Sequence, residues 1–187
     1  MADDRVQLAA IVGSVRAGRV APIVASWLMT QLGQHEQISI DMIDLAGLSL
    51  PDSLDGGGDA SGFAKRIDAA DGFIIVTPEY NHGYPGALKT AIDTARDEWR
   101  AKPVGFVSYG GTAGGLRAVE QLRLVFAELH AVTVRQAVSL HRVHDLFDGN
   151  GELRDPGAPA AARTMVAQLC WWAGALRKAR AESRYDV

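Results

Sequence analysis

Residues 72–77, Gly-Phe-Ile-Ile-Val-Thr, form an uninterrupted apolar run near the middle of the 187-residue chain. The run is rich in β-branched residues, is too short for a helix and is followed by Pro78, so it predicts a buried central strand. Similar apolar runs occur at residues 6–12, 104–109 and 132–138, and a run that alternates polar and apolar residues occurs at 38–45. The chain therefore contains five candidate strands, of which the alternating one lies nearer an edge of a sheet.

Segments with helical spacing of apolar residues separate these strands, at residues 20–32, 61–70, 86–100, 116–129 and 158–184. Parallel strands need a crossover of about a dozen residues or more, which such helices supply. The alternation predicts an α/β fold in which helices cover both faces of a five-stranded parallel sheet. Outside this pattern we expect a surface loop at 49–62 and a small hairpin at 146–153. Neither segment resembles a linker, so we expect one domain over residues 1–187.

Composition excludes several classes of protein. The chain is 48% hydrophobic and 22% charged, as in ordinary globular proteins, and its net charge of −3 argues against a general nucleic-acid binder. A single cysteine, Cys170, excludes a disulfide framework, a multi-cysteine metal site and CxxC redox chemistry. No stretch approaches the ~20 apolar residues of a transmembrane helix, and the N-terminus lacks the features of a signal peptide. We therefore expect a cytoplasmic protein with no membrane partner.

The most unusual local sequences follow three of the predicted strands. In open parallel sheets ligands bind beyond the carboxyl ends of the strands, so these loops form the candidate site. Residues 13–19, Gly-Ser-Val-Arg-Ala-Gly-Arg, lead into a helix and offer backbone N–H groups, a serine hydroxyl and two arginines to a phosphate. A glycine turn with two solvated arginines is the alternative. The loop matches neither a P-loop nor a dinucleotide-binding turn, and it has no cysteine nucleophile.

The other two loops combine glycine with aromatic and polar residues. Residues 77–86, Thr-Pro-Glu-Tyr-Asn-His-Gly-Tyr-Pro-Gly, offer flat surfaces with hydrogen-bonding tips. Glu79 and His82 are candidate acid–base groups, while loop packing with Glu79 in an ion pair is the alternative. The third loop, residues 108–117, has four glycines within the six residues 110–115. These glycines indicate either backbone lying flat against a planar ligand or a tight entry into the next helix.

Together these segments resemble the NADPH-dependent FMN reductase family, whose members include quinone, azo-dye and chromate reductases. The stretches that carry the resemblance are GSVRAGR at 13–19, TPEYNHGYPGALKTAID at 77–93 and SYGGTAGGLRAVEQLRLVFAELHAVTVR at 108–135. They stand in the family's order and spacing and, with the strand pattern, cover most of residues 6–138. The resemblance implies a flavodoxin-like three-layer sandwich with strand order 2-1-3-4-5.

The resemblance also implies a set of FMN-binding residues. Those that would hold the phosphate are Ser14, Arg16 and Arg19, with the backbone N–H groups of Val20 and Ala21. Those that would line the isoalloxazine ring are Pro78, Glu79, Tyr80 and Asn81. Those that would flank its pyrimidine side are Ser108, Tyr109, Gly110 and Gly111. Some family members have Ser and Asn where this chain has Arg19 and Ala21.

The implied activity is transfer of hydride from NADPH or NADH to flavin N5, followed by reduction of a small molecule such as a quinone, free flavin, azo dye or metal oxyanion. The protein then supplies binding and orientation, and no catalytic nucleophile is expected. The alternative is a flavodoxin-like electron carrier that serves a protein partner, although such carriers are usually far more acidic than −3. The sequence does not distinguish NADPH from NADH or identify the acceptor.

The resemblance further implies a homodimer or homotetramer with the flavin near a subunit boundary. Glu79 and Arg117 resemble residues used across that boundary, and residues 86–99 and 116–129 would supply the interface. Trp171 and Trp172 are expected to be core and interface aromatics, and residues 177–180 a solvated helix end. His141 and His144 offer two metal ligands where a zinc site needs at least three, so a structural role is expected.

Overall fold

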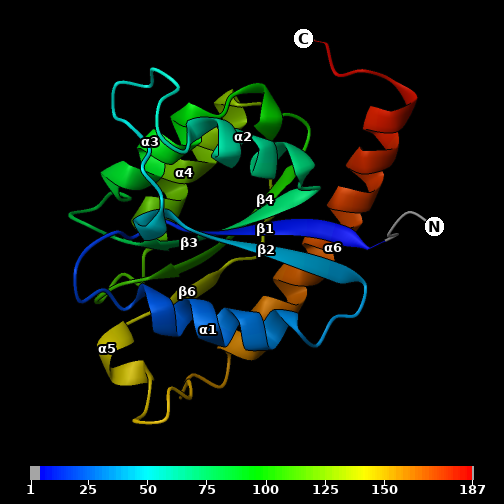
Figure 1. The fold of residues 1–187 in the computed structure, drawn as a ribbon. Helices are drawn as coiled ribbons and strands as arrows, with labels where there is room; N and C mark the ends of the chain where they lie inside the picture. The colour runs from blue at the N-terminus through cyan, green and yellow to red at the C-terminus, as the bar shows by residue number, and fades with distance from the viewer. Residues whose placement is uncertain (1–4, 187) are drawn as a thin grey trace.

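The structure is a computed structural model that describes residues 5–186. Its centre is a parallel sheet in the order β2-β1-β3-β4-β5, with β6 also paired to β4 (Figure 1). The strands are β1 (Val6–Val12), β2 (Ile38–Asp44), β3 (Gly72–Pro78), β4 (Pro103–Tyr109), β5 (Val132–Thr133) and β6 (Val138–Leu140). The strand order is the predicted one, and it places the reversal of order between β1 and β3, where open sheets bind ligands.

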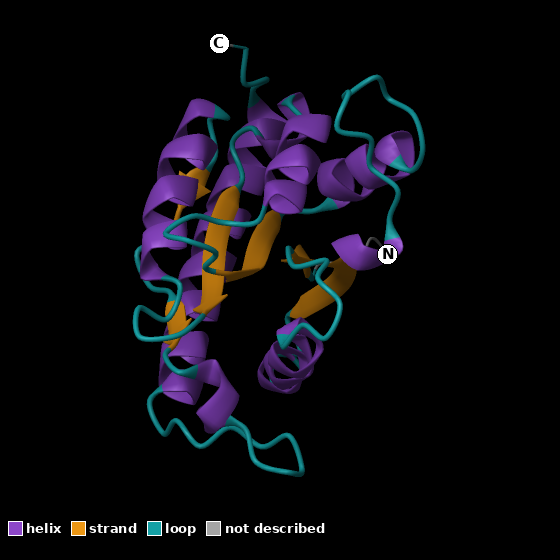
Figure 2. Cartoon of the chain, turned by 90° about the vertical axis from the view of Figure 1, so that its left-hand side faces the viewer, coloured by secondary structure: helices purple, strands orange, loops and turns teal. Residues whose placement is uncertain are grey.

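Helices cover both faces of the sheet, as Figure 1 and the turned view of Figure 2 show. One face carries α1 (Ala21–Leu32) and α6 (Ala158–Glu182). The other carries α2 (Ala60–Ala69), α3 (Gly86–Thr94) and α4 (Leu116–Glu128). The remaining short helices are η1 (Leu45–Gly47), η2 (Asp97–Trp99) and α5 (Val143–Leu146). Among the described residues, no helix is both long and apolar enough to cross a membrane.

Alternation along the strands divides the interior into two cores. In β1, Leu8 and Ala10 face the core beneath α1 and α6, whereas Ala9 and Ile11 face the core beneath α2, α3 and α4. Because both faces are covered, β3 and β4 are buried along their whole length. This explains why their sequences read as continuous apolar runs rather than as alternating patterns.

Two predicted elements are wrong in extent. The strand expected at 132–138 is split into β5 and β6, because the backbone N–H of Gln136 pairs with the Gln168 side chain on α6 instead of with β4. The helix expected at 86–100 ends at Thr94. There the buried Trp99 indole donates to the carbonyls of Ile92 and Ala95 and so satisfies backbone groups at the helix end.

Two expectations for the last helix are wrong in part. Arg177 and Arg180 are not a solvated end, because both pair with Asp71, whose side chain is only 11% exposed. Trp171 is 66% exposed and packs edge-on against Trp172, so it does not belong to the core.

Near residue 150 the predicted hairpin is reduced to a single antiparallel bridge between Phe147 and Leu153.

Candidate cofactor-binding site

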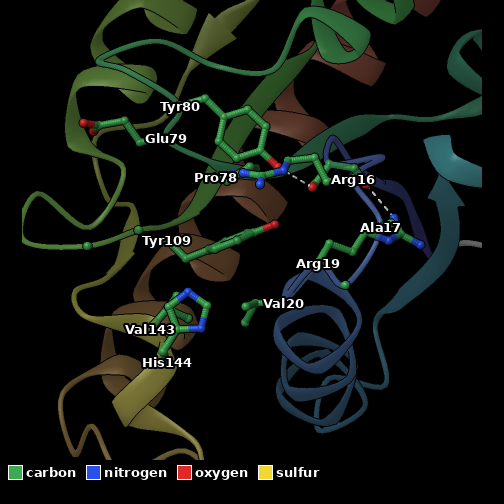
Figure 3. Close-up of a pocket in the computed structure, with 14 residues that line it drawn as sticks. Arg16, Ala17, Arg19, Val20, Pro78, Glu79, Tyr80, Tyr109, Val143 and His144 are labelled. Carbon is green, nitrogen blue, oxygen red and sulfur yellow. Dashed lines mark hydrogen bonds between the residues drawn. The ribbon is translucent and has the colours of Figure 1, made fainter.

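A pocket of about 290 Å³ lies at the carboxyl ends of β1, β3 and β4 (Figure 3). Its lining residues are Ser14, Arg16, Ala17, Gly18, Arg19, Val20, Pro78, Glu79, Tyr80, Tyr109, Gly110, Gly111, Val143 and His144. All the residues predicted from the three loops take part except Ala21, Asn81 and Ser108. Segments that lie far apart in sequence, from Ser14 to His144, therefore meet at the reversal point of the sheet, because parallel strands end at one edge.

The β1–α1 loop forms the wall nearest α1. The Gly13 N–H donates to the Val76 carbonyl, which ties the start of the loop to β3. Arg19 closes the loop: its guanidinium donates to the Ser14 carbonyl at 2.5 Å and makes two 2.6 Å hydrogen bonds to Asp44 at the end of β2. The Arg19 guanidinium lowers the pKa of the Asp44 carboxyl, which therefore stays ionised at neutral pH.

Arg16 is placed differently from Arg19. Its side chain is exposed, its guanidinium lies 5.3 Å from the centre of the Tyr80 ring, and it has no carboxylate partner among residues 5–186. Beside it α1 begins at Ala21, after Val20, without a side-chain cap. An uncapped helix N-terminus and a cation with no carboxylate partner on one wall attract an anionic group such as a phosphate.

The β3–α3 loop places Tyr80 over the pocket and turns Asn81 away from it. The Tyr80 hydroxyl pairs with the Ser14 hydroxyl at 2.7 Å and joins the first two loops. Asn81 and His82 both have left-handed backbone angles, with φ of 50° and 70°, and Tyr80 and Gly83 exchange backbone hydrogen bonds around them. This tight turn places Asn81 in a neighbouring hollow with His82 and Arg117.

Glu79 adopts the ion-pair alternative. Its side chain is 7% exposed and pairs with Arg117 of α4, whose Nε donates to it at 2.6 Å and whose backbone N–H donates at 3.2 Å. Arg117 also donates to His82 Nε2 at 2.8 Å. Because a guanidinium only donates, the ring nitrogen is the acceptor in this contact. The pair forms here within one chain, so Glu79 adopts the ion-pair role and its carboxylate is occupied by Arg117.

For the glycines of the third loop, the tight-entry alternative is realised by Gly114 and Gly115, while contact with a planar ligand stays a prediction for Gly110 and Gly111. Gly110 and Gly111 line the pocket. Gly114 and Gly115 have φ of +59° and +86°, and a Cβ on Gly115 would lie 2.6 Å from the Cβ of Ser108. They therefore form the tight entry into α4. Ser108 lies behind the loop, fully buried, and its hydroxyl donates to the Gly114 carbonyl at 2.8 Å.

The sequence reasoning missed Ala17, Gly18, Val143 and His144 as lining residues. The first two lie inside a loop already singled out, but no local pattern at 143–144 indicates that α5 returns to the pocket. His141 does not join His144 there: its ring nitrogens face the Thr112 carbonyl and the Ser139 hydroxyl. Within residues 5–186, no three potential metal-binding side chains gather.

Tyr109 provides the test of which ligand fits. It is 3% exposed and lines the pocket from the end of β4, yet its hydroxyl oxygen has no hydrogen-bond partner. Figure 3 shows the ring extending toward the side chains of the β1–α1 loop. A polar atom left without a partner at an anion-attracting wall, opposite glycine backbone and aromatic rings, suits a planar cofactor that carries a phosphate. The fold and the pocket thus define a protein that binds a flavin nucleotide.

Comparison with known proteins identifies the family. The sequence pattern of the NADPH-dependent FMN reductases matches residues 6–145. An NAD(P)H-dependent FMN reductase of Schizosaccharomyces pombe is 36% identical over 146 residues, covering 71% of this chain and 72% of its own. A 2-hydroxy-1,4-benzoquinone reductase of Burkholderia sp is 32% identical over 178 residues, covering 89% and 95%. The chain belongs to the NADPH-dependent FMN reductase family, and it is an FMN-dependent oxidoreductase that uses NAD(P)H.

Solved structures show the same fold. The flavoenzyme FerB of Paracoccus denitrificans, an NAD(P)H:acceptor oxidoreductase, superposes with a TM-score of 0.73 at 22% identity, covering 90% of this chain and 97% of its own. A WrbA-like flavodoxin of Agrobacterium tumefaciens superposes with a TM-score of 0.58 at 16% identity, covering 92% and 98%. The predicted flavodoxin-like architecture is confirmed.

Proposed function

We propose that FMN binds in the pocket at the ends of β1, β3 and β4, and that quinones are the electron acceptors reduced there. One observation carries the location: the pocket brings the anion-attracting β1–α1 loop together with aromatic and glycine walls from β3 and β4. Arg16 and the N-terminus of α1 would hold the phosphate, with Ser14 and Val20 beside them. The backbone from Pro78 to Tyr80 and from Tyr109 to Gly111 would enclose the ring.

The remaining predicted residues support the site from behind. Arg19 holds the loop to Asp44, Ser108 fixes the entry to α4, and Ala21 begins α1. Glu79 is neutralised by Arg117, which keeps a buried carboxylate from repelling a phosphate-bearing ligand. When bound, FMN supplies hydride acceptance from NAD(P)H and electron transfer to the second substrate. The chain's own residues bind, orient and limit access, and we assign none of them a covalent role.

The choice of quinones rests on the Burkholderia relative, which is 32% identical over 89% of this chain and is a benzoquinone reductase. Azo compounds form the second candidate class, because an FMN-dependent NADPH-azoreductase of Staphylococcus haemolyticus is 28% identical over 85% of the chain. Free flavin, also expected from the resemblance, is supported by the name of the Schizosaccharomyces pombe relative, an FMN reductase at 36% identity, whereas none of the relatives named here acts on metal oxyanions by its name. We keep both NADPH and NADH as donors.

The protein is proposed to act as a single-domain, cytoplasmic homo-oligomer. Helix α4, part of the expected interface, exposes Leu124 by 76% and Leu116 by 48%, and apolar side chains that are exposed this far suit burial against a second copy. Light scattering on the purified protein tests the assembly, and a monomeric mass at micromolar concentration would contradict it. Cell fractionation tests the location.

Steady-state kinetics test the function. The FMN-loaded protein should oxidise NADPH or NADH slowly alone and much faster with 1,4-benzoquinones, and a panel with azo dyes and free FMN ranks the acceptors. Protein that takes up no FMN would contradict the proposed site. Protein that binds FMN but reduces a partner flavoprotein in place of any small molecule would instead favour the electron-carrier alternative.

A further inference from the structure

The Tyr109 hydroxyl is the one buried side-chain polar atom among the described residues that lacks a hydrogen-bond partner. The side chain is 3% exposed, so a ligand oxygen reaches the hydroxyl only where neighbouring side chains of the pocket move aside on binding. A buried polar group left in this state lowers the stability of a protein, and native structures retain few of them. A phenylalanine would fill the same space without that cost. We therefore expect the hydrogen-bond partner of this hydroxyl to belong to a bound ligand and not to the chain.

The surroundings of this hydroxyl show what kind of partner fits. Nearby, the Ser14 and Tyr80 hydroxyls are already paired with each other at 2.7 Å. The Arg19 guanidinium lies close enough to favour a negative charge here, although Asp44 takes two of its hydrogen bonds. Figure 3 shows the Tyr109 ring reaching from β4 across the pocket toward this loop. The hydroxyl thus lies on the anion-attracting side of the pocket, not on the side of the glycine backbone.

The protonation state of Tyr109 makes it a donor. Burial raises the pKa of the phenol well above its ordinary value near 10, and the neighbouring Ser14 hydroxyl opposes this only in part. At neutral pH the group therefore presents an O–H whose neighbour within the chain, the Ser14 hydroxyl, already pairs with Tyr80. An anionic oxygen is the strongest acceptor that such a donor can meet.

We propose that the Tyr109 hydroxyl donates a hydrogen bond to a phosphate oxygen of FMN and so serves as a specificity residue that distinguishes FMN from riboflavin. This inference rests on the proposed location of FMN. It changes the role of Tyr109 from a flank of the pyrimidine ring, as the family resemblance implies, to a phosphate contact made by the side chain.

The inference has a signature that a merely structural tyrosine lacks. Because the hydroxyl gains nothing in the free protein, Tyr109→Phe should leave the melting temperature of the FMN-free protein unchanged or raise it. The same variant should bind FMN roughly tenfold more weakly, the expected effect of losing one hydrogen bond to a charged group. Its affinity for riboflavin, which has no phosphate, should stay within about twofold of the wild-type value.

The experiment measures FMN and riboflavin affinity by flavin fluorescence, and melting temperature by calorimetry, on the full-length FMN-free chain. Tyr185→Phe removes a phenolic oxygen outside the pocket, where it pairs with His130, and should leave both affinities unchanged. Tyr80→Phe breaks the Ser14 pair and should lower the melting temperature, which shows that the assay detects a lost internal hydrogen bond.

Each other outcome overturns a definite statement. A lower melting temperature for Tyr109→Phe would show that the hydroxyl has a partner within the chain. Unchanged FMN affinity would remove its role in binding, and an equal loss for riboflavin would move the contact from the phosphate to the ribityl chain or ring. These results leave the proposed function intact, whereas wild-type protein that binds no FMN would overturn both.

Discussion

Arg16 and Arg19 look alike in sequence, three positions apart in one glycine-containing loop, but the structure separates their roles. Arg19 is 17% exposed and joins Asp44 to the Ser14 carbonyl, so its charge is largely neutralised. Arg16 is exposed and has no carboxylate partner among residues 5–186. We therefore expect Arg16 to supply the charge to a phosphate, while Arg19 positions the loop.

Substitution of the two arginines should give different results. Arg16→Ala should weaken FMN binding tenfold or more, with a smaller dependence of affinity on salt, and leave stability unchanged. Arg19→Ala should lower the free energy of unfolding by about 1 kcal/mol and weaken FMN binding indirectly, because the loop loses its tie. Fluorescence titration and urea unfolding measure the two quantities.

Asp44→Asn is the matched control for this pair, since it removes the partner of Arg19 and leaves both arginines in place. It should reproduce the stability loss of Arg19→Ala. If Asp44→Asn has no effect on stability while Arg19→Ala abolishes FMN binding, Arg19 contacts the phosphate directly and the division of roles is wrong.

At the level of elements, the junction between α2 and β4 depends on a buried lysine. Lys102 is 5% exposed, and its Nζ donates to the carbonyls of Ile67 and Asp68 at the end of α2. The residue that follows the C-cap of α2 is Asp71 and not a glycine. The side chain of Lys102, the residue just before β4, satisfies the last carbonyls of the helix instead. Burial, and then the nearby Arg180, lowers the pKa of Lys102 to about 8, against the opposing charges of Asp68, Asp71 and Glu98.

This pKa predicts a pH dependence of stability. Between about pH 8 and the unfolded value of 10.5 the unfolded chain binds more protons than the folded one, so Lys102 makes stability rise with pH in this window. The gain should be on the order of 2 kcal/mol. Urea unfolding at pH 8 and pH 10 measures it as a net rise, because the pKa values of Tyr109 and Cys170, which burial raises, act in the opposite direction over part of this window.

Two variants make the assignment specific. Lys102→Met should abolish most of the difference between pH 8 and pH 10, whereas Lys65→Met, at an exposed position on α2, should retain it. The same difference in Lys102→Met as in the wild type would show that other groups control stability in this range.

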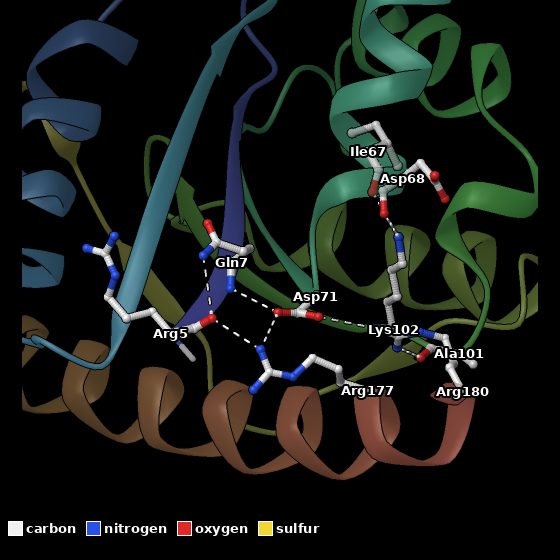
Figure 4. A network of polar contacts seen from close by, with 9 residues as sticks. All are labelled: Arg5, Gln7, Ile67, Asp68, Asp71, Ala101, Lys102, Arg177 and Arg180. Carbon is white, nitrogen blue, oxygen red and sulfur yellow. Dashed lines mark hydrogen bonds and ion pairs between the residues drawn. The ribbon is translucent and has the colours of Figure 1, made fainter. Parts of the chain in front are cut away.

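Across the whole molecule, the two edges of the sheet have separate tasks. The pocket occupies the carboxyl ends of the strands, and a polar network occupies the opposite edge, about 20 Å away along the seven-residue strand β1 (Figure 4). Asp71 is the centre of this network. It accepts from the Gln7 backbone N–H at 3.0 Å and pairs with Arg177 and Arg180, which binds α6 to β1 and β3.

Loss of the Asp71 charge should therefore affect stability and not binding. Asp71→Asn should lower the free energy of unfolding by about 2 kcal/mol, since it leaves two partly buried guanidinium groups without their carboxylate. FMN affinity should stay within about twofold of the wild-type value. Asp186→Asn, at an exposed ion pair with Arg184, should change neither quantity. A marked loss of FMN affinity in Asp71→Asn would show that the two edges are coupled.

Much of the fold was readable from the amino-acid sequence, because the period of apolar residues is a local property. The β-branched run at 72–77 and the helical spacing at 116–129 correspond closely to β3 and α4. The three glycine-containing loops were recognisable as a ligand site for a similar reason: their residue types are unusual and follow strands directly. The carboxyl ends of parallel strands lie at one edge of the sheet, which brings these loops together.

The amino-acid sequence alone does not show which side chains come into contact. Arg19 pairs with Asp44 across a sequence separation of 25 residues, and Arg117 pairs with Glu79 across 38. Arg180 pairs with Asp71 across a separation of 109 residues. The break between β5 and β6 and the return of α5 to the pocket depend on such distant partners as well. Local composition determines the elements and the place of the site. The packed structure alone decides which charges are neutralised. It also decides which polar groups, such as the Arg16 guanidinium and the Tyr109 hydroxyl, are expected to meet a ligand, because both outcomes depend on contacts between segments remote in sequence.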